Sequence, residues 1–179
     1  MKNIIILLTS CFLITTLYAQ DVKDANTKMD VFASKTGVIV KFEDYKLDDI
    51  KLSYGKAEAK IRKFIIGGEV KFFYQISNQG KYDTKVASIA YEDLIEMRKA
   101  LSSLKSQASS DAGSSLDYVE NKFVTEDGFQ VGYYVSKGKL NWYLKLEKYG
   151  QGSTIFIKDG LVIEEAFETA KNKMDELRG

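Results

Sequence analysis

Hydrophobic and polar positions alternate with a period of two along most of the chain, which predicts strands. In GVIVKFEDYKL, for example, Val38, Val40 and Phe42 fall on one face. Further alternating segments lie at 50 to 54, 57 to 66, 69 to 77, 84 to 91, 116 to 127, 129 to 137, 139 to 149 and 153 to 158. Gly67-Gly68 separates two of them as a hairpin turn would. We therefore expect antiparallel β-meanders.

The pattern changes to helical spacing in two places. After Tyr91, apolar residues recur at Leu94, Met97, Leu101 and Leu104. The second helix is expected over residues 161 to 177, with its apolar face formed by Ile163, Ala166, Phe167, Ala170, Met174 and Leu177. The predicted fold class is α+β, with antiparallel meander sheets covered by two amphipathic helices.

The order of elements repeats along the chain. An offset of 70 places Gly68 on Gly138, Val70 on Leu140, Phe72 on Trp142 and Tyr74 on Leu144, and an offset of 66 places Ile89 on Ile155. Either the chain holds two tandem ββββα units, over 30 to 106 and 116 to 179, or alternation common to all sheets produces the match. Between them, SQASSDAGSS at 106 to 115 predicts a flexible serine-rich connector.

The N-terminus predicts export. Lys2 precedes an apolar run from Ile4 to Leu17, which is shorter than the roughly 18 to 20 residues that a membrane helix needs. We expect residues 1 to 19 to be a signal peptide cleaved after Ala19, leaving residues 20 to 179 as one α+β domain. The mature protein would then be periplasmic or extracellular, with no transmembrane segment.

A second interpretation of the leader is a lipoprotein signal. Leu8-Thr9-Ser10-Cys11 has the residue order of a bacterial lipobox, but the residues after Cys11 are apolar, and the apolar region before it is short. Cleavage after Ala19 is therefore favoured over lipidation at Cys11. The leader ending in Tyr18-Ala19-Gln20 resembles those of exported Bacteroidota-type bacterial proteins, and this resemblance implies no activity.

The composition narrows the available chemistry. The chain has no histidine, and its single cysteine lies in the predicted leader, so the usual zinc sites and the histidine-activated nucleophiles have no candidate residues. We expect no metal, cofactor or catalytic residue, and an enzyme is disfavoured but not excluded. Because 26 basic residues face 25 acidic ones, a broad surface for nucleic acid is not expected.

A sheet face that is aromatic and cationic is the main candidate site. Alternation turns Phe73 and Tyr143 away from the helix-covered side, among Lys71 and Lys145, and it also places Tyr134 outward. Such a face could bind a protein, a peptide or a saccharide through stacking and buried apolar area. The competing interpretation is that these are ordinary strand residues, or that the two halves cover each other.

The leading hypothesis is an exported, non-catalytic binding protein whose ligand and oligomeric state are unknown. One alternative is a carboxylate-based extracytoplasmic hydrolase, for which the adjacent pairs Asp48-Asp49, Glu92-Asp93 and Glu164-Glu165 are candidates. The last two pairs fall near helix N-termini, where the helix dipole explains them. The other alternative is a carrier of lipid or another apolar ligand, held in a cavity between sheet and helix.

Overall fold

The computed structural model describes residues 26 to 149 and 151 to 179, so the predicted signal peptide lies outside the described residues. The first half runs through α1 (Lys28–Ala33), β1 (Val40–Lys46), β2 (Ile50–Lys51), β3 (Lys56–Ile66), β4 (Glu69–Gln79), β5 (Thr84–Ala90) and α2 (Tyr91–Ala112). The second half runs through β6 (Tyr118–Val124), β7 (Gln130–Ser136), β8 (Lys139–Lys145), β9 (Thr154–Ile157) and α3 (Gly160–Arg178). None of the helices in the described residues is long and apolar enough to cross a membrane.

The strands form two antiparallel sheets, which confirms the predicted α+β class. The first sheet has the order β1-β3-β4-β5, with β2 paired to β3, and the second has the order β6-β7-β8-β9. The β3–β4 turn holds Gly67 and Gly68 at φ 56° and 86°, and the β7–β8 turn holds Lys137 and Gly138 at φ 51° and 72°. Positive φ at both central residues is the requirement of a type I′ hairpin turn.

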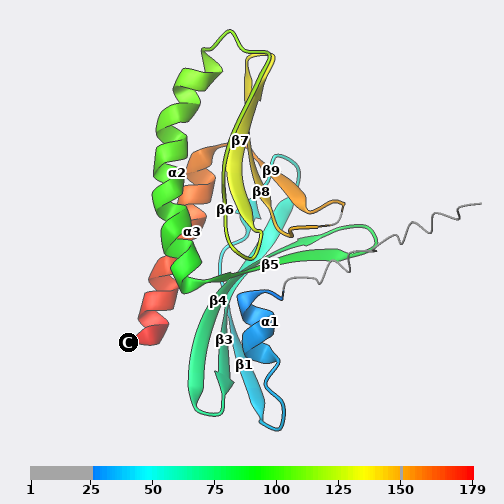
Figure 1. The fold of residues 1–179 in the computed structure, drawn as a ribbon, viewed down its shortest axis with the longest axis vertical. Helices are drawn as coiled ribbons and strands as arrows, with labels where there is room; N and C mark the ends of the chain where they lie inside the picture. Colours follow the sequence, from blue (N-terminus) through cyan, green and yellow to red (C-terminus); the bar gives the residue numbers. More distant parts are fainter. Residues whose placement is uncertain (1–25, 150) are drawn as a thin grey trace, which may run out of the picture.

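In the described part of the chain, three helices flank the sheets. Figure 1 shows α2 and α3 side by side on one side of both sheets, whereas α1 lies on the opposite side of the first sheet. α3 begins after Asp159, whose side chain accepts the Leu161 N–H at 2.9 Å. The first residue of α3 is a glycine, Gly160. A larger residue would not fit there, because its Cβ would lie 2.9 Å from the Trp142 ring.

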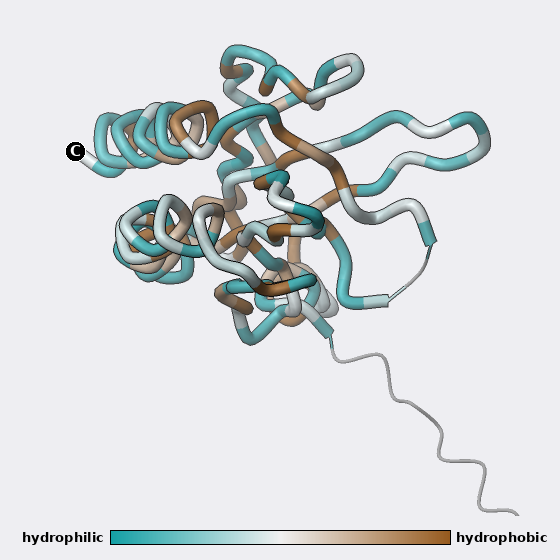
Figure 2. Tube along the Cα trace, turned by 90° about the horizontal axis from the view of Figure 1, so that it is seen from above, coloured by the Kyte–Doolittle hydropathy of each residue, from teal (hydrophilic) through white to brown (hydrophobic). Residues whose placement is uncertain are grey.

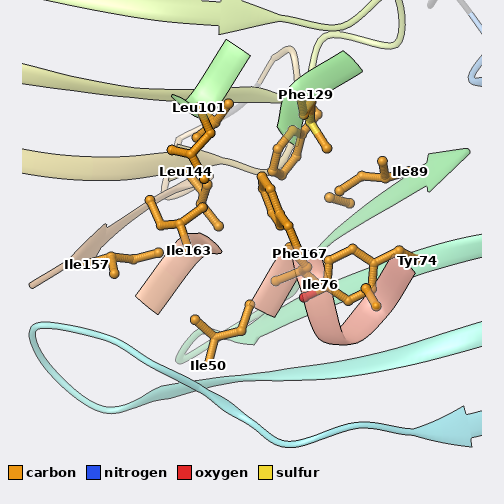
Figure 3. Close-up of a cluster of buried hydrophobic side chains, with 14 of the residues drawn as sticks. Ile50, Tyr74, Ile76, Ile89, Leu101, Phe129, Leu144, Ile157, Ile163 and Phe167 are labelled. Carbon is orange, nitrogen blue, oxygen red and sulfur yellow. The ribbon is translucent and has the colours of Figure 1, made fainter. Parts of the chain in front are cut away.

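One hydrophobic core joins both sheets to α2 and α3. Figure 3 shows Tyr74 and Ile76 of the first sheet, Leu144 of the second sheet, Leu101 of α2 and Phe167 of α3 in one cluster. In Figure 2 the hydrophobic stretches gather where sheets and helices face each other, and the protruding hairpin loops are hydrophilic. Burying one such side chain stabilises the fold by about 1.5–3 kcal/mol, and both halves supply members of the same core.

The two halves hold equivalent residues at equivalent positions of their sheets. Tyr74 pairs with Ile89 across β4 and β5, and Leu144 pairs with Ile155 across β8 and β9. These are the residues that the offsets of 70 and 66 connect. β2 and the loops beside it have no counterpart in the second half. The boundaries at 30 to 106 and 116 to 179 stay a prediction.

Residues 28 to 33 form α1, a helix that the hydrophobic pattern did not predict. The helix is started by a capping box. The Thr27 hydroxyl accepts the Asp30 N–H at 3.1 Å, and the Asp30 carboxylate accepts the Thr27 N–H at 3.1 Å. The Thr-x-x-Asp spacing was the sequence signal for this helix. A second, smaller difference is that the strand predicted over 50 to 54 is reduced to β2.

A flexible connector was predicted over residues 106 to 115. This prediction is wrong for residues 106 to 112, because α2 continues to Ala112. Ala108 is buried in the core. Asp111 accepts hydrogen bonds from the Tyr133 hydroxyl at 2.6 Å and from the Asn121 amide at 2.7 Å. These tertiary contacts stabilise the last turns of α2, where serine-rich composition alone gives only weak helix propensity.

Candidate binding face of the second sheet

Alternation along β6 to β9 gives the second sheet two different faces. Val131, Tyr133 and Leu144 point toward α2 and α3 and are fully buried. The opposite face, here called the outer face, carries Tyr118, Glu120, Lys122, Tyr134, Lys139, Tyr143, Lys145 and Phe156. In Figure 1 all three helices lie away from this face.

Four aromatic side chains, Tyr118, Tyr134, Tyr143 and Phe156, meet on the outer face as an aromatic patch. Tyr118 stacks on Tyr134 with ring centroids 5.9 Å apart and an interplanar angle of 23°. Tyr134 also contacts Tyr143 at 6.5 Å and Phe156 at 6.4 Å, the second with its ring nearly perpendicular. Tyr118 is 56% exposed and Phe156 45%, whereas Tyr143 is 5% exposed. Tyr143 is therefore the floor of the patch, and the other three rings form its accessible surface.

Glu120 holds this arrangement in place. Its carboxylate accepts the Tyr143 hydroxyl at 2.5 Å and the Tyr118 hydroxyl at 3.1 Å, and Lys122 Nζ lies 3.4 Å away. The Tyr143 hydrogen bond is the main cause that lowers the pKa of Glu120, so the carboxylate is ionised at neutral pH. Burial, followed by the bond to Glu120, raises the pKa of Tyr143. Both oxygens of Glu120 are thus engaged by the patch itself.

The charged residues around the patch are mostly basic. Lys122, Lys139 and Lys145 lie on the outer face, and Glu120 is the carboxylate among them. Lys122 is paired with Glu120, but Lys139 and Lys145 make no ion pair with any described residue. The outer face therefore presents positive charge beside exposed aromatic rings.

Three of the five predicted contact residues come together here. Tyr134, Tyr143 and Lys145 lie on the outer face, as alternation predicted. The expectation that Tyr143 is exposed is wrong, because Tyr134, Phe156 and Glu120 cover its ring. Sequence reasoning missed Tyr118 and Phe156, which alternation along the first and last strands of the sheet would have placed beside Tyr134.

The other two predicted contacts, Lys71 and Phe73, lie on the first sheet. Phe73 points away from α2 and α3 as predicted, but it is only 1% exposed. It packs edge-on against Phe64, which in turn contacts Phe32 of α1. The Lys71 Nζ lies 4.9 Å from the Phe32 ring centre. Phe73 and Tyr143 therefore share no exposed surface, because they lie in different sheets and α1 covers Phe73.

A cluster of carboxylates elsewhere bears on the hydrolase alternative. Asp93 is buried and binds Lys28 Nζ at 2.6 Å, and both oxygens of Asp127 accept the Lys28 backbone N–H at 3.0 and 3.1 Å. Burial raises the pKa of Asp127, and the nearby Asp93 charge adds to that rise. Because these groups bind the N-terminal end of α1, the structure gives them a role in docking that helix.

The remaining alternatives gain no specific support. Within residues 26 to 149 and 151 to 179, no group of acidic residues is arranged to hold a metal ion. The side chains of both sheets, α2 and α3 pack together as one core in the region where a carrier would hold its apolar ligand. Comparisons of the chain with protein-family models, curated proteins and solved structures gave no match.

Proposed function

We propose that this chain is an exported, non-catalytic binding protein, and that the aromatic patch of the second sheet binds an acidic helical segment of a partner protein. The observation that carries the proposal is the equivalence of the two outer faces. Export rests on the leader alone, whereas the binding mode rests on the patch and on the corresponding surface of the first sheet.

The corresponding surface already has a helical occupant. The offsets place Phe64 on Tyr134, Phe73 on Tyr143 and Ala90 on Phe156. The first member of each pair is buried together with Phe32, the one buried residue of α1. A short helix that inserts one aromatic side chain thus covers this position in the first half. In the second half, the same position is lined by larger aromatic rings that no described helix covers.

The charges around the aromatic patch indicate the sign of the partner's charge. Lys139 and Lys145 are free of ion pairs with the described residues, and the charge of Glu120 is balanced within the patch. An acidic segment would therefore gain complementary contacts at the rim, while its aromatic or aliphatic side chain packs on Tyr118, Tyr134 and Phe156. Stacking of Tyr118 on Tyr134 leaves less flat ring surface for a saccharide, which favours a peptide.

A peptide titration tests the proposal. The probe is a labelled peptide of residues 26 to 36, which contains α1, with Lys28→Glu and Lys35→Glu to make it acidic. We expect saturable binding at low salt that Tyr134→Ala weakens at least fivefold, since an interface anchor is worth 1 kcal/mol or more. Lys145→Glu should also weaken it. Tyr82→Ala, which removes a tyrosine 88% exposed in the β4–β5 turn, should have no effect.

Two results would contradict the proposal. One is a peptide affinity that is equal for the native chain, Tyr134→Ala and Tyr82→Ala. The other is that a saccharide such as cellohexaose shifts the NMR signals of Tyr134 and Phe156 whereas the acidic peptide does not. This result would show that the outer face binds carbohydrate instead of a peptide.

Export is tested separately by the intact mass of the mature protein. A chain that begins at Gln20 supports release after Ala19. A mass that includes a lipid-modified Cys11 at the N-terminus would contradict this part of the proposal without affecting the patch.

A further inference from the structure

A pocket at the edge of the first sheet contains buried polar atoms that the fold leaves without partners. It has a volume of about 310 Å³ and lies between the loop before β2 and helix α3. Among the described residues, two buried side-chain atoms make no hydrogen bond, Asp49 Oδ1 and Tyr74 Oη. Asp49 and Tyr74 both line this pocket. A buried polar atom without a partner is costly, so two such atoms on one pocket indicate that it can hold a hydrogen-bonding group.

Tyr74 is held rigidly and is fully buried. Its ring packs edge-on against Phe167 of α3, with ring centres 6.3 Å apart. In Figure 3 its hydroxyl oxygen points toward the side of the cluster where Ile50 lies, and Ile50 also lines the pocket. Burial raises the pKa of Tyr74, so the hydroxyl stays neutral and can both donate and accept a hydrogen bond.

The fold itself does not require a hydroxyl at this position. The equivalent residue of the second sheet is Leu144, which is also fully buried. The opposite wall is likewise specific to the first half, because β2 and its flanking loops have no counterpart in the second half. A tyrosine and a carboxylate that have no equivalent in the second half therefore face this pocket, whose remaining wall is α3.

The charges around the pocket favour a cation. Lys56 binds Asp49 Oδ2 at 2.5 Å and lowers the pKa of Asp49, so this carboxylate is ionised and its free oxygen can only accept a hydrogen bond. Asp48 and Glu165 also line the pocket, and neither makes an ion pair with a described residue. Lys51 also lines the pocket, and the charges of Lys56 and Lys46 act on Asp49, so the preference for a cation comes from Asp48 and Glu165, the two carboxylates without an ion pair.

We infer that this pocket binds a small protonated organic amine, whose ammonium group donates to Asp49 Oδ1 and to the Tyr74 hydroxyl oxygen. The apolar part of the amine packs on Ile50, Val162 and Ala166, which line the same pocket. The inference is independent of the partner proposed for the outer face.

The experiment is an NMR titration of the folded chain with benzylamine. Benzyl alcohol and benzoate are the neutral and anionic analogues of the same shape. We expect benzylamine to cause saturable shifts of the amides of residues 50 to 51 and 162 to 169, benzyl alcohol to bind more weakly, and benzoate not to bind. Tyr74→Phe should weaken benzylamine about 2- to 10-fold, the value of a neutral hydrogen bond, and Asp49→Asn about 10- to 100-fold.

The control variants are Tyr82→Phe and Asp83→Asn. Tyr82 is exposed, and Asp83 is paired with Lys85 at 3.1 Å as Asp49 is with Lys56, so neither change should alter the affinity. Tyr74→Phe removes no hydrogen bond and should fold as stably as the native chain, which keeps the test interpretable. The inference is overturned if benzylamine causes no saturable shifts, if benzyl alcohol binds equally well, or if a crystal structure shows only a water between Tyr74 and Asp49 in the presence of benzylamine.

Discussion

Tyr143→Phe is the sharpest test of how the aromatic patch is organised. The change removes one hydroxyl that donates to Glu120 at 2.5 Å and leaves the ring in place. A hydrogen bond to a charged group is worth about 1.5–3 kcal/mol. The Glu120 side chain is 29% exposed, so water replaces part of the lost bond, and we expect a loss of about 1 kcal/mol in the free energy of unfolding.

The same face offers matched controls, because its tyrosines differ in what their hydroxyls bind. Tyr118 donates to Glu120 at 3.1 Å from an exposed position, and the Tyr134 hydroxyl makes no hydrogen bond with the described residues. Urea denaturation should therefore rank the losses as Tyr143→Phe, then Tyr118→Phe, then Tyr134→Phe near zero. Equal losses for Tyr143→Phe and Tyr134→Phe would refute the role assigned to Glu120.

The effect of Tyr143→Phe should also depend on pH in a defined direction. The folded state lowers the pKa of Glu120, so the stability that its ionised form contributes is present above the unfolded pKa of about 4.3 and is lost as pH falls through the folded value. The difference between Tyr143→Phe and the native chain should therefore shrink below pH 4. A difference that stays constant from pH 7 to pH 3 would show that the carboxylate charge plays no part.

Two further changes test other parts of the structure. Hydrogen bonds from Arg62 and then Lys60 lower the pKa of Asp44 to about 2. After solvent screening of its one-third exposed carboxylate, Asp44 should add about 1 kcal/mol to the free energy of unfolding. Asp44→Asn should lose this stability above pH 4, and urea denaturation should show the difference from the native chain disappearing as pH falls to 2. Phe32→Ala should undock α1, because six residues do not persist as an isolated helix, and hydrogen exchange of residues 28 to 34 should accelerate while the core of the second sheet stays protected.

Much of the fold follows from local patterns. Alternation in residues 69 to 77 correctly turned Phe73 away from the helix-facing side, where Phe72 and Tyr74 pack, because strand geometry alone decides these directions. α1 was missed because six residues give too short a hydrophobic period to detect. The last turns of α2 were missed because their partners, such as Tyr133, lie far away in the sequence.

The candidate site was predictable only in part, for a related reason. Alternation states which way Tyr134 and Tyr143 point, and it was right for both. Exposure depends on what covers a face, which is a tertiary property. Phe73 is closed off by α1, and Tyr143 by its own neighbours, and neither contact could be read from the strands that carry these residues. Asp49 and Tyr74 are likewise brought to one pocket by chain reversal.

The contrast between the two outer faces is what links the fold to a function. Both sheets carry apolar side chains at corresponding outward positions, and a helix that covers them removes apolar surface from water. The first sheet obtains it from α1, which inserts Phe32 between Lys71 and Phe64. On the second sheet Tyr118 and Phe156 stay about half exposed, and the tyrosine hydroxyls and basic rim make that exposure tolerable in water. This surface is stable uncovered, yet it has the geometry of one that a helix covers, and for this reason we propose that it binds a helix from another chain reversibly.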